Sequence, residues 1–201
     1  MTDELKQFLI DNKPLLVRND FDTLYKRAAS TSGLCKQLTE FLYNVAKLDP
    51  LPHMTTITRA MFQGITLNQQ LVVPKNIKMN ATDDCYINSL TVPVLILECD
   101  LEGSAIMRSS IDKIIYKGTS EKVPRNFLSN VNCQKLALPE TITRIANSAF
   151  NYFDGKIVTP YRSDPAKRLI VPKNEIDWYK EHLRFTHAPK ESEVEDGIKE
   201  N

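Results

Sequence analysis

The segment Leu136-Ala137-Leu138-Pro139, three apolar residues followed by a proline, recurs in altered form between residues 71 and 172. The other copies are Leu71-Val72-Val73-Pro74, Leu90-Thr91-Val92-Pro93, Ile114-Ile115-Tyr116-Lys117, Ile157-Val158-Thr159-Pro160 and Leu169-Ile170-Val171-Pro172. Their fourth positions lie 19, 24, 22, 21 and 12 residues apart, so four of the five intervals are close to 22. Because proline has no backbone N–H to donate, a triplet followed by proline is expected to be a short strand that ends there.

A strand of three residues cannot bury its apolar face alone, whereas strands from successive units can stack into a continuous parallel ladder and core. A repeat of about 20–29 residues with one short strand per unit is typical of leucine-rich-repeat solenoids. The sequence therefore predicts an irregular solenoid of this kind over residues 53–188. The run Leu95-Ile96-Leu97 is interpreted as an extra strand, and the last, short interval as a capping strand followed by a helix from Glu175 to about Phe185.

Three segments resemble the BspA-type leucine-rich-repeat family. The most specific is Leu138-Pro139-Glu140-Thr141-Ile142-Thr143-Arg144-Ile145-Ala146-Asn147-Ser148-Ala149-Phe150, which is similar to units of the form lP-x-x-v-t-x-I-x-x-x-a-F. Residues 110–119 resemble a variant unit, and residues 170–180 resemble the terminal unit. The resemblance covers roughly residues 57–183. It implies a solenoid fold and a binding role, and no particular reaction.

Residues 1–52 have a helical pattern instead and are expected to form a helical head. Lys13-Pro14 should end the first helix, and Asp20 is a candidate N-cap for the second. The apolar faces of the three expected helices consist of Leu5, Phe8 and Leu9; Phe21, Leu24, Tyr25 and Ala28; and Leu34, Leu38, Phe41, Leu42 and Val45. The predicted fold class is therefore α+β: a helical head, a solenoid of short parallel strands and a C-terminal capping helix.

The chain has 201 residues, of which 42% are hydrophobic and 25% charged, as in ordinary globular proteins. No apolar core of a secretory signal is present near the N-terminus, and the apolar run from Val92 to Leu97 is too short to span a bilayer. The four cysteines, Cys35, Cys85, Cys99 and Cys133, form no CxxC pair and are expected to be reduced and mostly buried. We therefore expect a cytoplasmic protein with no membrane partner.

No residue pattern indicates catalysis. The sequence contains no GxxxxGK[ST], GxGxxG, HExxH or GxSxG motif. His182 and His187 are five residues apart, which places them on different sides of a helix, so they are not expected to share a metal ion. We expect a non-enzymatic protein that requires no cofactor or metal.

The net charge of +1 is unevenly distributed. Residues 1–100 contain 10 basic and 11 acidic side chains, residues 101–190 contain 15 and 9, and residues 191–201 contain 1 and 5. The second half of the solenoid is therefore basic, with a net charge of +6, and the tail has a net charge of −4. Because residues 189–201 hold almost no apolar side chains, they are expected to form a disordered acidic tail.

Aromatic residues are interleaved with the basic residues of the second half. Cations that follow phosphates and aromatic rings that stack on bases are the usual elements of single-stranded nucleic-acid binding. We expect Lys117, Lys135, Lys156 and Lys173 to lie at corresponding edges of successive turns as a basic stripe. The candidate nucleic-acid-binding residues are Lys113, Lys117, Lys122, Arg125, Lys135, Arg144, Lys156, Tyr161, Arg162, Lys167, Arg168 and Lys173. Tyr161 and Tyr179 are the aromatic residues expected to be most accessible, whereas Phe127, Phe150 and Phe153 occupy positions expected for the core.

The preferred hypothesis is a protein that binds single-stranded DNA as a viral or bacterial accessory factor of transcription or replication, with a host or viral polymerase as a further partner. This charge layout is loosely similar to that of single-stranded-DNA-binding accessory proteins of bacterial viruses. The alternative is a protein–protein adaptor or inhibitor that uses the solenoid face and the helical head. Self-association into a homo-oligomer through the open edge of the solenoid is a further expectation.

Overall fold

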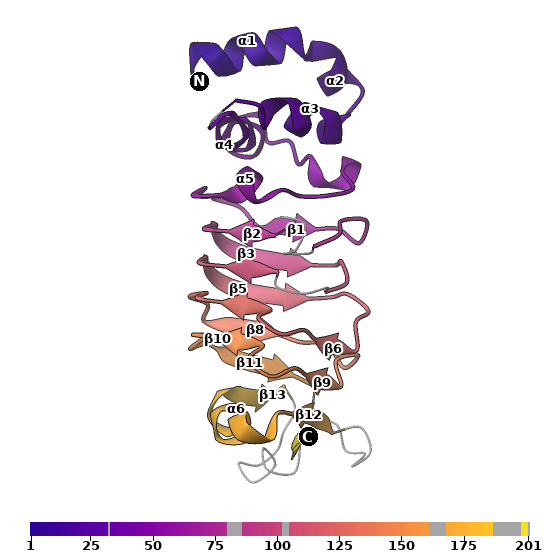
Figure 1. Ribbon diagram of the computed structural model, residues 1–201, viewed down its shortest axis with the longest axis vertical. Helices are drawn as coiled ribbons and strands as arrows, with labels where there is room; N and C mark the ends of the chain where they lie inside the picture. The colour runs from indigo at the N-terminus through magenta and orange to yellow at the C-terminus, as the bar shows by residue number, and fades with distance from the viewer. Residues whose placement is uncertain (32, 80–85, 102–104, 161–167, 187–197, 201) are drawn as a thin grey trace.

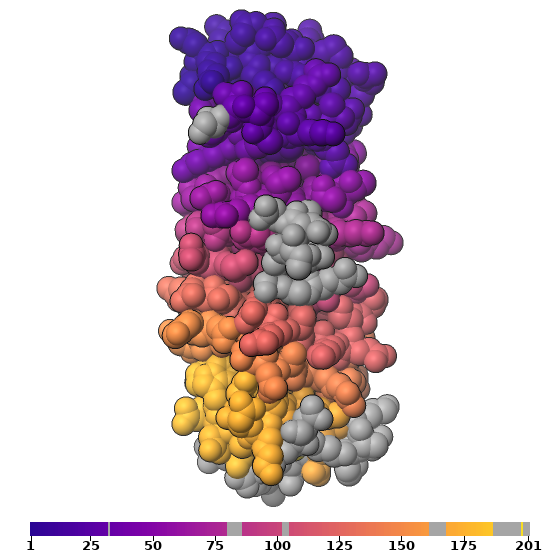
Figure 2. Space-filling view, viewed as in Figure 1, coloured from indigo at the N-terminus to yellow at the C-terminus, as the bar shows by residue number. Residues whose placement is uncertain are grey.

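The computed structural model describes residues 1–31, 33–79, 86–101, 105–160, 168–186 and 198–200. The molecule is an elongated column whose long axis follows chain order, with the helical head at one end and the C-terminal residues at the other (Figure 1). Figure 2 shows the same order on the surface, where successive parts of the chain form successive bands along the column. The predicted α+β fold is confirmed: a helical N-terminal region, a parallel-strand solenoid of about four turns and a C-terminal helix.

The head contains α1 (Asp3–Asp11), α2 (Lys13–Val17), α3 (Phe21–Ala28), α4 (Leu34–Glu40), the π-helix η1 (Phe41–Ala46), the 3₁₀ helix η2 (Leu51–His53) and α5 (Arg59–Phe62). Asp20 caps α3 as predicted, because its side chain accepts a hydrogen bond from the backbone N–H of Thr23 at 3.2 Å. The first helix ends at Asp11, just before Lys13-Pro14 as predicted, but these two residues begin a further short helix. Pro14 lies in the first turn of α2, where a backbone N–H has no intrahelical partner to lose.

The predicted third helix changes its winding after Glu40, where α4 continues as the π-helix η1. The wider turn of a π-helix moves the following side chains out of phase with the apolar face of the preceding α-helix. Val45, which was expected on that face, is consequently 69% exposed, and Tyr43 is buried instead. The helical pattern therefore predicts the helix and the burial of Leu42, but it places Val45 on the wrong side.

The predicted stack of short parallel strands forms one six-stranded sheet, here called the long sheet. Its strands are β1 (Leu71–Val73), β3 (Thr91–Leu97), β5 (Ser110–Tyr116), β8 (Lys135–Ala137), β11 (Lys156–Thr159) and β13 (Leu183–Phe185), in that order. One inward-facing position aligns through all six strands as Leu71, Leu95, Ile114, Leu136, Ile157 and Leu183, and each of these residues is fully buried. This core column shows how triplets that are weak alone form one continuous core.

The register corrects two of the predicted repeats. The core column passes through Leu95 rather than through the triplet that begins at Leu90, and Thr91–Leu97 is a single strand rather than two. The triplet Leu169–Val171 does not belong to the long sheet at all. Its interval of 12 residues is short because it lies within one turn, not between two turns.

Two narrower sheets complete each turn, whereas one strand per unit was expected. The second sheet consists of β2 (Ile87–Asn88), β4 (Ile106–Met107), β7 (Leu128–Ser129) and β10 (Phe150–Asn151). The third sheet consists of β6 (Lys122–Val123), β9 (Arg144–Ile145), β12 (Leu169–Val171) and β14 (Ile198–Glu200). In Figure 1, β6, β9 and β12 follow one another down one side of the column. All strand pairs of the three sheets are parallel.

The corner after each strand of the second sheet has the same backbone conformation. Ser89, Arg108, Asn130 and Tyr152 all have φ between 49° and 55°, in the left-handed region that L-residues seldom adopt. The corners stack through backbone bonds, with the N–H of Ser89 donating to Met107 O at 3.0 Å and that of Arg108 donating to Ser129 O at 2.9 Å. Repetition of one corner in every turn keeps the strands in register.

The C-terminal end is closed by η5 (Lys173–Glu175), α6 (Ile176–His182) and β13. The capping helix ends three residues earlier than expected, because Leu183–Phe185 pair with β11 in the long sheet. Glu175 replaces the missing next turn at one corner, where its Oε1 accepts a hydrogen bond from the N–H of Ser148 at 2.7 Å. Among the described residues, no helix has the length and apolar character needed to cross a membrane.

The expected acidic tail lies mostly outside the described residues, since 187–197 and 201 are not among them. Ile198–Glu200, which were expected to be disordered, form β14 and pair with β12. Ile198 is the apolar residue of this segment, and its side chain is 6% exposed. Burial of the Ile198 side chain stabilises the strand, an effect that cannot be seen from the average composition of the tail.

Candidate nucleic-acid interface

The outer face of the long sheet contains a ladder of lysines. Lys113, Lys135 and Lys156 are paired in register on β5, β8 and β11, and all three are exposed. Each one directly precedes a buried member of the core column, so alternation along the strand directs its side chain outward. Neighbouring strands lie about 4.8 Å apart, and the three ammonium groups therefore project from closely spaced positions. We call these residues the lysine column.

An aliphatic column runs beside the lysine column, two residues further along each strand. It consists of the paired residues Val72, Ile96, Ile115, Ala137 and Val158. These side chains are partly exposed except for Ile96, which is 9% exposed. Arg184 follows at the end of this column, paired with Val158. The face therefore presents positive charges and apolar side chains in parallel rows.

The lysine column has no carboxylate partner among the described residues. Within those residues the one ion pair is Lys36–Glu40, at 3.9 Å in α4. The Nζ atom of Lys156 donates to the backbone oxygen of Glu181 at 3.2 Å, a contact that leaves the charge of Lys156 uncompensated. Asp112 precedes Lys113 and is the acidic residue next to the column in sequence. Like charges directly opposite one another on adjacent strands repel, so this arrangement favours an anionic ligand.

A second basic group lies on the third sheet. Lys122 and Arg144 are paired on β6 and β9, and Arg125 follows at the next corner. These three side chains line a hollow of about 330 Å³, which we call the basic cleft. The remaining lining residues are Ile145, Ala146, Asn147, Ile170 and Pro172.

The other candidate residues do not join either group. Lys117 lies with Lys75, Glu98, Asp100 and Thr119 around a separate hollow, where two carboxylates offset the positive charge. Hydrogen bonds from the N–H and hydroxyl of Thr119 hold the pKa of Asp100 below its usual value. Lys173 is in η5, and Arg168 precedes β12 and is half-buried. Tyr161, Arg162 and Lys167 lie outside the described residues.

The single predicted stripe is therefore wrong in its membership. Lys135 and Lys156 are in one column as expected, but the third member is Lys113, and neither Lys117 nor Lys173 belongs to it. Lysines that follow a triplet lie past the end of the strand, where the chain leaves the sheet. Lysines that precede a triplet remain within the ladder and share its register.

The aromatic residues interleaved with these cations are mostly buried. Tyr116, Phe127, Phe153 and Tyr179 are between 0% and 3% exposed, which confirms the core role expected for the two phenylalanines and corrects the exposed position expected for Tyr179. Phe150 packs on Trp178 with ring centroids 5.9 Å apart, so it belongs to the same C-terminal cluster. Within the described residues Tyr152, at 85% exposed, is the large aromatic side chain with an open ring face. Base stacking on the predicted aromatic residues is therefore excluded for those that are buried.

The aliphatic column is the feature that the sequence reasoning missed. Its signal is present in the triplets, because a residue in the middle of a three-residue strand must face outward when its neighbours face the core. The middle residues of the aligned triplets are valine, isoleucine or alanine where a solvent-facing position would ordinarily be polar.

The thiols and imidazoles are placed in packing roles. Cys35, Cys99 and Cys133 are free and buried, and burial raises the pKa of each, that of Cys99 to about 12. His182 stacks on Trp178 with ring centroids 4.1 Å apart. Among the described residues, no group of three His, Cys, Asp or Glu side chains is arranged to hold a metal ion. Cys85 lies outside the described residues.

No family model, curated protein or solved structure matches this chain. The resemblance to BspA-type repeats therefore stays a prediction from the sequence.

Proposed function

We propose that this protein binds single-stranded nucleic acid along the outer face of the long sheet. The observation that supports this best is the lysine column, in which Lys113, Lys135 and Lys156 project in register, exposed and without carboxylate partners among the described residues. Phosphate contacts of this kind supply most of the affinity in sequence-independent binding.

The shape of the face favours a single strand over a duplex. Reading the major groove requires a helix or a two-stranded ribbon that protrudes into it, whereas the candidate face is the surface of a six-stranded sheet. A single strand can place its phosphates along the lysine column and turn its bases toward the neighbouring aliphatic column. Apolar contact with the valine and isoleucine side chains takes the place of stacking on the interleaved aromatic rings that are buried, which are those of Tyr116, Phe127, Phe153 and Tyr179.

The test is titration of a fluorescently labelled oligothymidylate, compared with a duplex of equal length, by fluorescence anisotropy. The triple variant Lys113→Gln, Lys135→Gln, Lys156→Gln should lose most of its affinity. The matched control replaces three exposed head lysines, Lys6, Lys13 and Lys26, by glutamine and should bind as the wild type does. Equal loss in both triple variants, or no binding by the wild type, would refute the proposal.

An accessory role in transcription or replication, with a polymerase as partner, belongs to the same proposal. A binding protein of this kind would act by covering a strand or by presenting it to an enzyme. Copurification of a polymerase subunit with the wild type, in the presence of nuclease, supports this part of the proposal. Copurification that disappears with nuclease would show that the strand, rather than the protein, forms the link.

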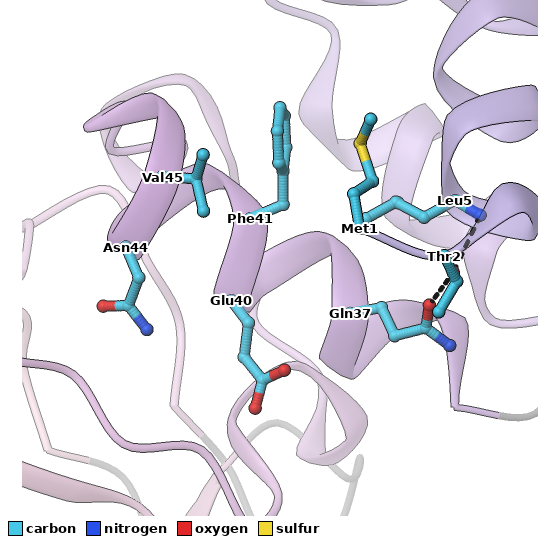
Figure 3. A pocket seen from close by; sticks show the side chains of 8 residues that line it. All are labelled: Met1, Thr2, Leu5, Gln37, Glu40, Phe41, Asn44 and Val45. Atoms are coloured by element: carbon cyan, nitrogen blue, oxygen red, sulfur yellow. Dashed lines mark hydrogen bonds between the residues drawn. The ribbon is translucent and has the colours of Figure 1, made fainter.

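A protein–protein adaptor is the second candidate, and the head supports it. Of the six large hydrophobic residues that are exposed, Met1, Ile10, Val17, Val45 and Leu48 lie in the head and only Tyr152 lies in the solenoid, among the described residues. A hollow of about 480 Å³ between α1 and the α4–η1 helix is lined by apolar side chains that include Met1, Phe41 and Val45, as Figure 3 shows. Thr2 bonds across it to Gln37.

Retention of a host protein after nuclease treatment tests the adaptor function. A Val45→Asp variant should lose that protein, and the triple lysine variant should keep it, if the head is the docking module. The reverse pattern would assign the interaction to the solenoid face.

A further inference from the structure

The basic cleft differs from the lysine column in both its side chains and its shape. Arg144 is paired with Lys122 on the adjacent strand, while their neighbours Ile145 and Val123 point into the core. Arg125 lies on the corner that follows β6, at the level of Asn147 in the next turn, since the N–H of Asn126 donates to Ser148 O. Three cations from two turns thus surround one hollow of about 330 Å³.

The charge of this cleft is uncompensated within the described part of the chain. None of the three cations forms an ion pair there, and no Asp or Glu is among the described residues that line the hollow. Glu121 directly precedes Lys122 in the sequence, and Glu175 of η5 accepts a hydrogen bond from the N–H of Ser148. Two like charges directly opposite on neighbouring strands destabilise a sheet. A bound anion would remove this repulsion, so the folded chain should favour its binding.

The side-chain chemistry points to one class of anion. The guanidinium group is a planar fork that donates two parallel hydrogen bonds to a phosphate or carboxylate, whereas the ammonium group acts as a point charge. The cleft has two such forks and one ammonium group, and the amide of Asn147 adds a further donor. The partly exposed side chain of Ile170, which is paired with Arg144, adds an apolar wall that lowers the local dielectric and strengthens the neighbouring charged contacts.

We propose that the basic cleft is a discrete binding site for a phosphate monoester. The volume of the hollow is at the lower end of the range for small-molecule sites, about 300 Å³, so a phosphate group with a small organic body fits it. This group can come from the terminal phosphate of a nucleic-acid strand or from a free phosphorylated small molecule. The site lies on the third sheet, apart from the lysine column on the long sheet, and does not depend on the function proposed for that face.

Inorganic phosphate is the probe. Titration at constant ionic strength, with chloride as the reference anion, is followed by the thermal unfolding midpoint and by calorimetry. Wild type should show saturable binding of phosphate, and Arg144→Gln and Lys122→Gln should each weaken it by about tenfold or more. The matched control is Lys26→Gln, at an exposed position on α3 in the head, which should bind phosphate as the wild type does.

Both residues of the test variants are exposed, and the strand pairing of β6 with β9 is made by the backbone. The variants should therefore unfold at or slightly above the wild-type temperature when phosphate is absent, because each removes the repulsion between Lys122 and Arg144. Phosphate that stabilises no better than chloride, or binding weakened equally by Lys26→Gln, would overturn the proposal.

Two oligothymidylates, one with a 5′-phosphate and one with a 5′-hydroxyl, distinguish the two sources of the phosphate. Tighter binding of the phosphorylated strand that is lost in Arg144→Gln assigns the site to strand ends. Equal binding of the two strands, together with phosphate binding that requires Arg144, assigns it to a free phosphorylated molecule. Because inorganic phosphate binding is measured separately, failure of strand binding on the long sheet leaves this site standing, and failure here leaves that function standing.

Discussion

Replacing Lys135 by glutamine should reduce the salt dependence of oligonucleotide binding by a fixed amount. Lys135 is the central member of the lysine column and is paired with both Lys113 and Lys156. Each lysine–phosphate contact with a single strand releases a counterion and contributes about −0.7 to the slope of log K against log salt. Three contacts give a slope of about −2.1, and the variant, with two contacts, should have a slope of about −1.4.

These slopes predict measurable changes in affinity. Between about 50 mM and 200 mM salt, the contribution of the three lysines should weaken binding by about 18-fold, and that of the two remaining lysines by about sevenfold. Other cations add equally to both proteins, so the difference of about 0.7 between the two slopes is the robust quantity. Anisotropy titrations of a labelled oligothymidylate at four or more salt concentrations measure it.

A head variant, Lys6→Gln, is the control and should retain the wild-type slope, because Lys6 is exposed on α1, far from the long sheet (Figure 1). An unchanged slope for Lys135→Gln would refute the reasoning, as would a slope near zero for the wild type. A reduced slope for Lys6→Gln would show that the strand contacts the head.

Three further predictions concern the packing of the head and the solenoid. Gly155→Ala should lower the free energy of unfolding by about 3 kcal/mol or more, because an added Cβ would lie 2.0 Å from the Cys133 carbonyl oxygen. Gly33→Ala should lower the free energy of unfolding by only about 1 kcal/mol, because no atom lies within 4 Å of the added Cβ although φ is +77°. Equal losses for the two variants in urea unfolding would contradict the close packing of Gly155 against Cys133. In a Cys85→Ser background, the three buried thiols should react with a disulfide reagent at about pH 8 only after the protein unfolds. Burial raises the pKa of each thiol, that of Cys99 to about 12, so the reactive thiolate is scarce in the native protein. Rapid labelling of the native protein would contradict this prediction. Stability should be constant near neutral pH and begin to fall above about pH 8.5, where unfolded thiols ionise, because burial raises the folded-state pKa of three cysteines. It should fall more steeply above about pH 10, where unfolded tyrosines ionise, because burial also raises the folded-state pKa of four tyrosines; a urea midpoint that stays constant up to about pH 11 would argue against it. These tyrosines are Tyr25, Tyr43, Tyr116 and Tyr179.

The sequence predicted those parts of the fold that rest on local rules. Asp20 begins a helix because a carboxylate that accepts an N–H bond needs only the next turn of chain. The triplets predicted stacked strands because an apolar triplet that recurs every 19 to 24 residues can be recognised without knowing which strands pair. The π-helical turn at Phe41–Ala46 was not predicted, because the residues of that segment fit an ordinary α-helical face equally well.

Register and sheet number were not predictable in the same way. The triplet at Leu90 and the run at Leu95 both satisfy the pattern, and only pairing with β1 selects Leu95. The second and third sheets consist mostly of two-residue strands, which are too short to show any periodicity.

Only part of the candidate site was predicted, because its residues are brought together by strand register. Lys135 and Lys156 were placed together correctly because each belongs to a strand with a clear triplet. Counting from the residue before each triplet, instead of the residue after it, would also have found Lys113. Tyr179 was assigned to the surface because its neighbours are polar, but α6 turns it into the C-terminal aromatic cluster, where it contacts Phe150 with ring centroids 6.3 Å apart.

The claim that the outer face of the long sheet is the strand-binding surface is tested most directly by lysine protection. The protein is acetylated with limiting reagent, with and without an excess of oligothymidylate, and each lysine is quantified by peptide mass spectrometry. Acetylation of Lys113, Lys135 and Lys156 should slow markedly when the strand is bound, whereas the head lysines should be modified at an unchanged rate. Uniform protection of all lysines, or protection confined to the head, would contradict the account.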